Sequence, residues 1–399
     1  MQVLHRCLLL LLLLSLAGSC REGQSGTTSE KATTTAADTL APSYATGFTA
    51  ITNTQGYTEL IINEPWPGAD RSFRYALVPD SLQTETYLAA IAGLRAEDES
   101  LKFDGIVGVP ITSMVLTSTT HIPALEALGT ADALVGFPGL DYISSTQTRE
   151  RISKGLVTEL GANEQLNTEL VLQLQPEALI GFAVSEAPKS YELIENSGIP
   201  VLYNGDWNEA TPLAKAEWIK FFGLLLDRQE EANAHFAAIE EEYLRVRSLA
   251  RQAAGKPTVL SGALYRDVWY LPGGKSWAAQ FVADAQGQYL WANTPQSGSL
   301  SLSLEVILEQ GESAEFWIAP SQFTSYSEML EANPHYDKIK AFQLRQVYGY
   351  ADSRGPTGGL LYFELGPNRP DLILKDLVFH LHPGLLTDYE PVFFKPLKP

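Results

Sequence analysis

Cysteine is almost absent from this chain: Cys7 and Cys20 are the two cysteines among 399 residues. Both lie near the N-terminus, so a protein cut before Cys20 has no disulfide and must fold on its hydrophobic core alone. Hydrophobic residues make up 45% of the sequence and aromatic residues 10%, which is typical of a globular protein. The length exceeds that of a usual single core, so we expect two domains.

Basic residues are also scarce. The chain has 28 lysines and arginines against 47 aspartates and glutamates, which gives a formal net charge of −19. A polyanion repels the phosphates of nucleic acids, and no lysine- or arginine-rich run offsets that repulsion. We therefore expect no nucleic acid among the partners.

The usual catalytic and cofactor signatures are missing. Residues 274–276 resemble the end of a phosphate-binding loop, but Trp269 stands where that loop needs a glycine. Neither a Gly-x-Ser-x-Gly elbow nor a dinucleotide Gly-x-Gly-x-x-Gly fingerprint occurs. Of the six histidines, His380 and His382 would point to different faces of a helix, and His121 reads as a surface or capping residue. We expect no enzyme, no resident cofactor and no metal site.

The N-terminus is typical of an export signal. Arg6 provides the positive charge, residues 8–14 form a short apolar run, and a small-residue cleavage site ends at Cys20. The apolar run is too short to span a membrane. The pattern is similar to a bacterial lipoprotein signal over residues 1–20, with Cys20 as the lipidated residue, although Ala17 replaces the usual leucine. An ordinary signal peptide is the alternative.

The remaining chain divides by composition and rhythm. Residues 21–45 are rich in small and polar residues without an apolar period, and we expect a flexible tether. Residues 46–210 begin with three strand-like runs, an antiparallel preface, and then alternate between strand and helix patterns. The same alternation returns over residues 256–399. It predicts two α/β lobes with parallel strands.

A long helical connector is expected between the lobes, over residues 211–255. Thr211 is the predicted N-cap and Gly255 the predicted left-handed end. Apolar residues recur at helical spacing between them, and roughly 42 helical residues would span about 60 Å. Asp227 and Glu230 have the spacing of a second capping box, so we expect a joint near Asp227.

A cluster of aromatic residues follows the connector. Seven aromatics lie between Tyr265 and Trp291. Most are compatible with ordinary core, but Tyr265, Trp269 and Tyr270 are expected in a loop beyond a strand end, where α/β folds bind ligands. Such a loop would offer an apolar platform with polar tips, and Arg266 could add a charge for an anionic group.

Six segments give the chain a recognisable order. They are residues 118–129, 133–137, 167–180, 197–202, 273–276 and 304–308. In order and spacing they resemble the iron-siderophore and cobalamin substrate-binding proteins of ABC importers. The likeness covers about residues 106–399, and no single motif within it is specific.

The resemblance implies two doubly wound α/β lobes bridged by a long rigid helix, with a metal chelate in the cleft between them. It also implies one permease-docking carboxylate on each lobe. Glu305 takes this position on the second lobe, whereas Pro123 stands there on the first, which leaves Glu126, one turn later, as the candidate. Position in the fold makes Tyr142 the expected ligand contact of the first lobe, with Arg149 and Arg151 as weaker candidates.

The leading hypothesis is a monomeric, lipid-anchored binding protein on the periplasmic side of a bacterial membrane. It would capture a ferric siderophore or a cobalamin and deliver it to a permease and its ATPase. A secreted α/β hydrolase and a protein-binding lipoprotein scaffold remain as alternatives. The sequence leaves the chelate, its affinity and the choice of membrane open.

Overall fold

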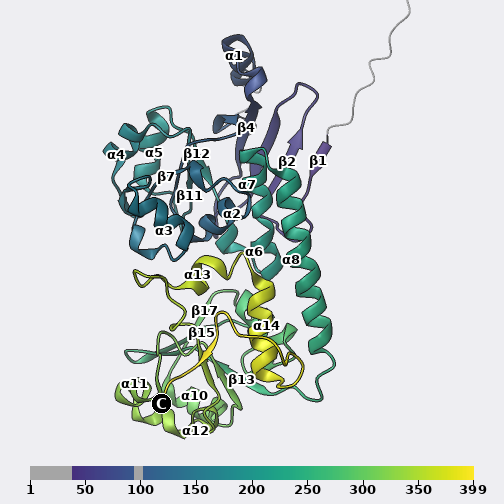
Figure 1. Cartoon of the computed structure of the whole chain (residues 1–399), viewed down its shortest axis with the longest axis vertical. Coiled ribbons are helices and arrows are strands. Elements are labelled where there is room, and N and C mark those ends of the chain that lie inside the picture. Colours follow the sequence, from purple (N-terminus) through teal and green to yellow (C-terminus); the bar gives the residue numbers. More distant parts are fainter. Residues whose placement is uncertain (1–37, 94–101) are drawn as a thin grey trace, which may run out of the picture. The chain divides into compact units, whose positions relative to one another are not determined.

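The computed structural model describes residues 38–93 and 102–399, which lie within one compact unit, Ala36–Pro399. Two α/β lobes follow one another along this unit, and a long helix joins them (Figure 1). The predicted fold class is thereby confirmed. Cys20 and the expected signal segment lie outside the described residues, so lipidation stays a prediction. None of the described helices has the length and hydrophobicity that a membrane span requires.

A five-stranded sheet opens the first lobe, in the order β1-β2-β3-β4-β5. Neighbouring strands are antiparallel except β4 and β5, which are parallel, so the predicted antiparallel preface is confirmed. Its apolar face packs toward the connector, where the rings of Phe48 and Phe221 lie 6.3 Å apart. The elements are β1 (Asp38–Leu40), β2 (Phe48–Thr52), β3 (Thr58–Ile62), β4 (Phe73–Pro79), α1 (Glu85–Gly93) and β5 (Gly105–Val109).

The predicted tether, residues 21–45, extends too far. Strand β1 already pairs with β2, and the segment after it is held by the Glu217 carboxylate. This carboxylate accepts backbone N–H groups of Ser43, Tyr44 and Ala45 at 2.8, 2.7 and 2.9 Å. The partner lies more than 170 positions away, so composition alone gave no sign of this contact.

The main sheet of the first lobe is parallel throughout, in the order β12-β11-β6-β7-β8. Local signals define its helices: the side chain of Asn167 accepts the N–H of Leu170 at 3.1 Å and so caps α4. The strands are β6 (Met114–Leu116), β7 (Leu134–Phe137), β8 (Thr158–Glu159), β11 (Ala178–Gly181) and β12 (Val201–Tyr203). The helices are α2 (Ile122–Ala127), α3 (Thr146–Ser153), α4 (Thr168–Leu174) and α5 (Lys189–Asn196). A short hairpin of β9 (Gly161–Ala162) and β10 (Gln165–Leu166) follows β8.

The second lobe also has a five-stranded main sheet, with a different strand order, β16-β13-β18-β19-β20, in which only β20 is antiparallel. A second, antiparallel sheet contains β14, β15 and β17. The strands are β13 (Thr258–Ser261), β14 (Ala263–Tyr265), β15 (Val268–Pro272), β16 (Gln288–Tyr289), β17 (Ser299–Leu302), β18 (Phe316–Ile318), β19 (Val347–Gly349) and β20 (Lys395–Pro396). The helices are α9 (Trp277–Asp284), α10 (Leu304–Gly311), α11 (Tyr326–Ala332), α12 (Lys340–Gln343), α13 (Leu361–Leu365) and α14 (Pro370–Leu381).

The connector consists of three helices, so the prediction of one rod of about 42 residues is wrong. They are α6 (Pro212–Glu217), α7 (Ile219–Leu226) and α8 (Gln229–Ala250). The predicted start is confirmed, because the Thr211 side chain accepts the N–H of Ala214 at 3.3 Å. The predicted end is wrong: α8 stops at Ala250, and Gly255 is not among the residues with positive φ.

The predicted joint at Asp227 is confirmed, but it works differently. Asp227 ends α7 in the left-handed conformation, with φ 53° and ψ 50°, and no side chain caps α8, so the capping box with Glu230 does not form. Helices α7 and α8 then pack closely, since a Cβ on Gly223 would lie 2.7 Å from the Cβ of Ala232. The chain therefore reverses at the joint, and α7 and α8 form a helical hairpin (Figure 1).

Helix α8 leads the chain from the first lobe into the second. Its 22 residues correspond to about 33 Å. Ala232, Phe236 and Ile239 belong to the core of the first lobe, whereas Tyr243 and Val246 belong to the core of the second. A helix buried in both cores limits how the lobes can move.

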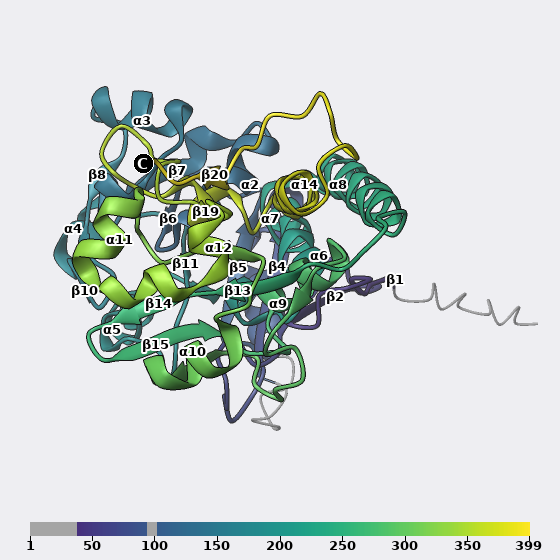
Figure 2. The same cartoon turned by 90° about the horizontal axis from the view of Figure 1, so that it is seen from below.

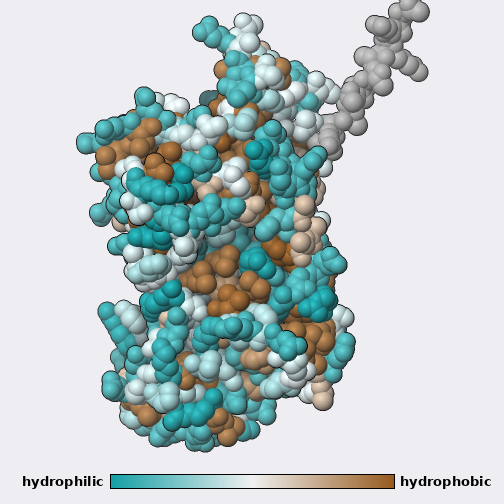
Figure 3. Space-filling model, viewed as in Figure 1, coloured by the Kyte–Doolittle hydropathy of each residue, from teal (hydrophilic) through white to brown (hydrophobic). Residues whose placement is uncertain are grey.

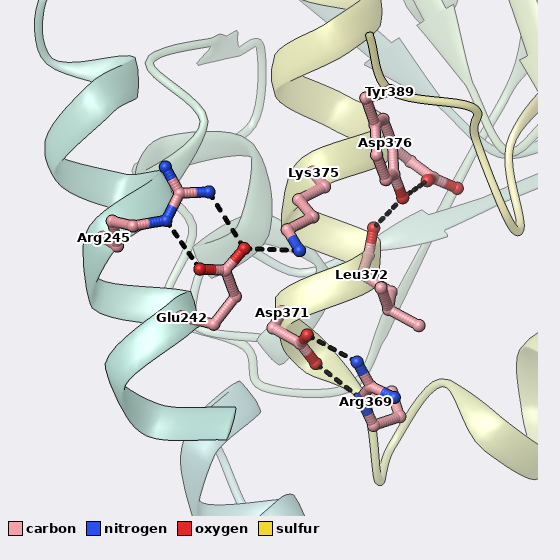
Figure 4. A network of polar contacts seen from close by, with 8 residues as sticks. All are labelled: Glu242, Arg245, Arg369, Asp371, Leu372, Lys375, Asp376 and Tyr389. Carbon is pink, nitrogen blue, oxygen red and sulfur yellow. Dashed lines mark hydrogen bonds and ion pairs between the residues drawn. The ribbon is translucent and has the colours of Figure 1, made fainter. Parts of the chain in front are cut away.

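Helix α14 lies alongside α8 in both views (Figures 1 and 2). Figure 4 shows the ion pairs at this contact: the Glu242 carboxylate of α8 accepts Arg245 Nε at 2.6 Å and also pairs with Lys375 of α14. These partners lower the pKa of Glu242 to about 2, with Arg245 the larger cause. On α14, the buried Asp376 carboxylate accepts the Tyr389 hydroxyl at 2.5 Å. The polar contacts fix the second lobe to the connecting helix.

Candidate ligand-binding cleft

The carboxyl ends of the first lobe's parallel strands open onto a cleft of about 740 Å³. Doubly wound sheets bind ligands at this edge, beside the point where the strand order reverses. That point lies between β6 and β11, because β7 and β8 lie on one side of β6 and β11 and β12 on the other. Thr117 follows β6 and Phe182 follows β11, and both line the cleft. The second lobe contributes Arg354, Gly359 and Phe363.

One carboxylate shapes the first-lobe wall. Glu159, at the end of β8, accepts the N–H groups of Gly139 and Leu140 at 2.8 Å each and that of Gly161 at 2.9 Å. Gly139 takes φ 72°, a left-handed conformation that favours glycine. Glu159 therefore holds the loop after β7 and the β9–β10 hairpin together, and much of this wall is backbone.

Tyr142 lies on this wall, as predicted. Its side chain is 71% exposed and lines the cleft, where it is available to a ligand. Arg149 and Arg151, the weaker candidates, are not among the lining residues. Arg149 donates to the Leu140 carbonyl at 2.7 Å, and Arg151 donates to the carbonyls of Asp132 and Leu134. Both arginines brace the wall from behind.

The cleft carries little charge. Arg354 and Glu164 are the charged residues in its lining. The Arg354 side chain donates from Nε to the Ala351 carbonyl at 2.7 Å and from Nη1 to the Gly358 carbonyl at 3.2 Å. These bonds fix the guanidinium within the loop that faces the first lobe. One fixed cation and one carboxylate suit a ligand of low net charge.

The segment that contains α13 and the residues on either side of it ties the second lobe to the first. The Glu364 carboxylate accepts the N–H groups of Ser144 and Ser145 at 2.5 and 2.8 Å. Asn368 donates to the Thr120 carbonyl at 2.8 Å, and Thr357 donates to the Asp141 carbonyl at 2.8 Å. Burial raises the pKa of Glu364 to about 7, although the two N–H donors oppose the rise.

Close backbone approach requires glycine in the same segment. A Cβ on Gly355 would lie 2.5 Å from Ser144 Cα, and one on Gly359 would lie 2.2 Å from the Tyr142 carbonyl oxygen. Any larger residue would push the lobes apart at the edge of the cleft. The position of Tyr142 thus depends on contacts from the second lobe.

Next to the cleft, the second lobe contains a cavity of about 440 Å³. Predicted residues Tyr265 and Tyr270 line it and are 64% and 45% exposed. Arg266 lies at the turn between β14 and β15 with φ 57°, and its guanidinium stands 5.4 Å from the Tyr265 ring, outside the lining. Phe363 lines both this cavity and the cleft.

Trp269 is buried, which contradicts its predicted role as a ligand contact. Its ring stacks on that of Trp317 at 5.2 Å, and its Nε1–H donates to the Ser261 carbonyl at 3.0 Å. Where a loop was expected, the structure has a β-hairpin of β14 and β15. Gly262, at φ 78°, follows β13 and turns the chain into β14. Adjacent residues of β15 alternate between faces, so Tyr270 faces outward and Trp269 inward.

Comparison with known proteins identifies the protein family. The family model described as "Periplasmic binding protein" matches residues 114–353, more than half of the chain. The chain belongs to the periplasmic binding protein family. The match begins at β6, so the five-stranded sheet of residues 38–109 lies outside it.

Curated relatives of this periplasmic binding protein include two uncharacterized lipoproteins of Methanocaldococcus jannaschii. One is 24% identical over 298 residues, covering 72% of this chain and 69% of the relative. The other is 21% identical over 308 residues, covering 72% and 77%.

Two solved structures are similar in fold. A periplasmic heme binding protein from Pseudomonas aeruginosa has a TM-score of 0.55 at 19% identity, over 72% of this chain and 99% of that one. A possible iron-binding (periplasmic solute-binding) protein from Staphylococcus epidermidis has a TM-score of 0.54 at 18% identity, over 68% and 99%. At this identity the likeness concerns the fold alone.

The two predicted docking carboxylates differ in their surroundings. Glu305 is exposed at the start of α10, where Ser303 lowers its pKa through a hydrogen bond. Glu126 is half-buried, and its carboxylate accepts the hydroxyls of Ser145 and, at 2.6 Å, Thr148. The geometry gives Glu126 a structural role at the start of α3.

His121 is buried, so the prediction of a surface residue is wrong. Its ring lies 5.5 Å from that of Phe222, and burial lowers its pKa to about 4. His380 and His382 bind different carbonyl groups: the Nε2 atom of His380 lies 2.8 Å from the Phe394 carbonyl oxygen, and that of His382 lies 2.8 Å from the Ala285 carbonyl oxygen. Across residues 38–93 and 102–399, no group of three or more His, Cys, Asp or Glu side chains could hold a metal ion.

Sequence reasoning missed most of the second lobe's contribution to this periplasmic binding protein's cleft. Arg354, Phe363 and Glu364 lie in a stretch that had no predicted element. A signal was present: residues 355–359 read Gly-Pro-Thr-Gly-Gly and are followed by an apolar, aromatic run. Closely spaced glycines mark backbone that approaches other groups.

Proposed function

We propose that this protein is the substrate-binding component of an ABC importer and that its cargo is a metal chelate. The cleft between two lobes, at the switch point of a periplasmic binding protein, is the observation that carries the proposal. Its volume of about 740 Å³ lies in the upper part of the usual range for small-molecule sites. The protein acts by binding and release, with no bond made or broken.

The cargo arrives as a finished chelate. The described residues offer no cluster of metal-ligating side chains, so the metal's ligands come from the cargo itself. Arg354 and Glu164 leave the lining nearly neutral, which favours a ferric hydroxamate, a cobalamin or another chelate of low charge over a trianionic catecholate. The proteins of similar fold named as heme binding and as possibly iron-binding support the class of cargo.

Delivery requires a permease and its ATPase. We assign permease docking to Glu305, because it is exposed on the second lobe and its carboxylate remains charged at neutral pH. A lipid on Cys20 would hold the monomeric protein at the periplasmic side of the membrane, and the lipoprotein names of the relatives support this anchor.

Titration tests the binding step. The purified protein is mixed with hemin, cyanocobalamin and a panel of ferric siderophores while tryptophan fluorescence is recorded, since Trp277 lies beside the cleft in the aromatic cavity. We expect saturable quenching by at least one chelate, and loss of that quenching in Gly359→Trp, which blocks the contact at the cleft edge. Absence of binding to every chelate would refute the proposal.

Uptake separates docking from binding. In cells that depend on this importer, Glu305→Arg should abolish uptake while leaving the affinity of the purified protein unchanged. Glu309→Arg, one turn later on α10 and also exposed, is the matched control and should retain uptake. Equal uptake by both variants would move the docking site elsewhere.

A further inference from the structure

The cavity of about 440 Å³ in the second lobe is chemically unlike the cleft. Its lining contains no Asp, Glu, Lys, Arg or His. Aromatic side chains dominate instead, among them Tyr265, Tyr270, Trp277, Tyr350, Tyr362 and Phe363. Figure 3 shows apolar side chains gathered on the surface where the two lobes meet, against mostly hydrophilic surroundings.

The aromatic walls are ordered by stacking. The rings of Tyr350 and Tyr362 are nearly parallel, 9° apart in plane and 4.7 Å between centroids. Tyr362 in turn stacks on Trp277 at 6.0 Å and 29°. Behind Trp277, the Lys215 ammonium lies 5.3 Å from the ring and is fixed by the carbonyls of Asp206 and Trp207. These ring contacts order the wall without any ligand.

Polar backbone groups near the cavity are already satisfied. The Pro272 carbonyl accepts the Tyr289 hydroxyl at 2.5 Å, and the Ser261 carbonyl accepts Trp269 Nε1–H at 3.0 Å. A charged occupant would find no counter-charge and would lose its hydration. An apolar, aromatic occupant would exchange water contacts for ring contacts, which is favourable.

The size of the cavity excludes a simple packing defect. Protein cores contain few voids larger than one water molecule, whereas this volume corresponds to roughly fifteen waters. The cavity is open, since Tyr265 and Tyr270 at its edge are exposed. It also adjoins the cleft, because Phe363 lines both.

We propose that the aromatic cavity is a second subsite, which receives an uncharged planar aromatic group of the cargo while the metal-bearing part lies in the cleft. This inference rests on the proposed function. It narrows the cargo to a chelate with two chemically distinct ends. The polar end meets Arg354, Glu164 and the backbone of the first lobe, and the aromatic end lies against Trp277 and Tyr362.

A pair of synthetic chelates tests the subsite. One is a ferric trihydroxamate, and the other is the same trihydroxamate with an appended naphthyl group. Burying about 100 Å² of aromatic surface should favour the naphthyl chelate on the order of 50-fold in the native protein. Ala278→Phe, which fills the cavity from α9, should reduce this preference to about 2-fold or less.

Two further variants complete the design. Ala283→Phe places the same side chain on an exposed position of α9 outside the lining, and it should keep the full preference. Ser299→Phe fills the cavity from an exposed strand position and replaces Ala278→Phe if that variant fails to fold. A preference that persists in a folded, cavity-filled variant, or that is absent in the native protein, would overturn the subsite.

Failure of the proposed function is recognised separately. If neither chelate binds the native protein, the chelate proposal fails, and the cavity is tested with 1-naphthol alone. Saturable binding of 1-naphthol that Ala278→Phe abolishes and Ala283→Phe retains would support the subsite. No binding of 1-naphthol to the native protein would overturn it.

Discussion

The Glu364 carboxylate joins the two lobes, and its charge state should make the protein's stability depend on pH. The side chain is 2% exposed and accepts the N–H groups of Ser144 and Ser145 from the other lobe. Burial raises its pKa to about 7, and the nearby Glu126 carboxylate adds to the rise. His121, on the 3-10 helix packed against α13, has its pKa lowered to about 4 and stays neutral above pH 5.

The direction and size of this pH dependence follow from the linkage between proton binding and folding. The folded-state pKa of about 7 lies above the ordinary value of 4.5, so Glu364 contributes most below about pH 4.5. That contribution is lost as the pH rises through about 7, because the ionised carboxylate is poorly accommodated. The difference between the two pKa values corresponds to about 3 kcal/mol. A glutamine at this position does not titrate, but its amide nitrogen cannot accept an N–H, so one of the two hydrogen bonds from Ser144 and Ser145 is lost at every pH.

The assay is urea unfolding of the native protein and Glu364→Gln at pH 5 and pH 8. The variant should be less stable than the native protein at pH 5, by about 1–3 kcal/mol for the lost hydrogen bond, and should recover about 2–3 kcal/mol relative to the native protein between pH 5 and pH 8. Identical pH dependence of the two proteins would refute a raised pKa at Glu364.

Two variants control for other titrating groups. Glu331→Gln removes an exposed carboxylate of α11 and should leave the pH dependence unchanged. Glu126→Gln should shift the loss of stability to lower pH, because it removes a repulsion that raises the pKa of Glu364. A shift in the opposite direction would show that the two carboxylates do not interact as described.

Three other substitutions test separate features. His121→Phe removes a buried imidazole whose pKa is lowered to about 4, and the native protein loses stability as the pH falls from 6.5 through 4 because this ring must take up a proton. The variant should keep that stability, which amounts to up to about 3 kcal/mol at pH 4 in urea unfolding. Equal loss of stability at acid pH in the two proteins would contradict this. Gly359→Ala puts a Cβ 2.2 Å from the Tyr142 carbonyl oxygen, so it should lower the unfolding free energy by roughly 1–3 kcal/mol and weaken chelate binding. Gly298→Ala, whose Cβ would have no atom within 4 Å, should change neither the unfolding free energy nor the binding. Asp227→Gly relieves a left-handed residue and should raise the unfolding free energy by roughly 1 kcal/mol in the same assay; a decrease would show that the aspartate side chain stabilises the joint.

Local signals in the sequence were enough to place most strands and helices. Thr211 and Asn167 cap their helices through bonds to residues three positions away. Such contacts lie within a few residues, so the sequence displays both partners together. The parallel strands are buried on both faces and therefore read as short apolar runs.

The connector shows which features can be predicted from neighbouring residues and which cannot. The joint at Asp227 was predicted from the capping-box spacing of Asp227 and Glu230, whereas the structure forms it through the left-handed conformation of Asp227. The reversal of the chain was not visible, because it depends on how closely Gly223 of α7 meets Ala232 of α8. A long rod and a hairpin share the same periodicity, and only packing distinguishes them.

The predicted ligand contacts also include residues that the structure leaves accessible and one that it buries. Tyr142, Tyr265 and Tyr270 are exposed and line the cleft or the cavity, and their role as ligand contacts stays a prediction. Tyr265 and Tyr270 lie on β14 and β15 and not in the expected loop. Trp269 was placed wrongly, because its face depends on the register of β15 with β14 and β17. A shift of one residue would exchange Trp269 and Tyr270.

By itself, the sequence determined the family and the two-lobe α/β plan. Periodicity, caps and motif order encode these, and each depends on residues close together in the chain. Tertiary structure decided which groups meet: Glu364 binds the backbone of Ser144, 220 positions away, and Phe363 lines both the cleft and the aromatic cavity. Contacts at such separations depend on the packing of whole lobes, which local patterns do not contain.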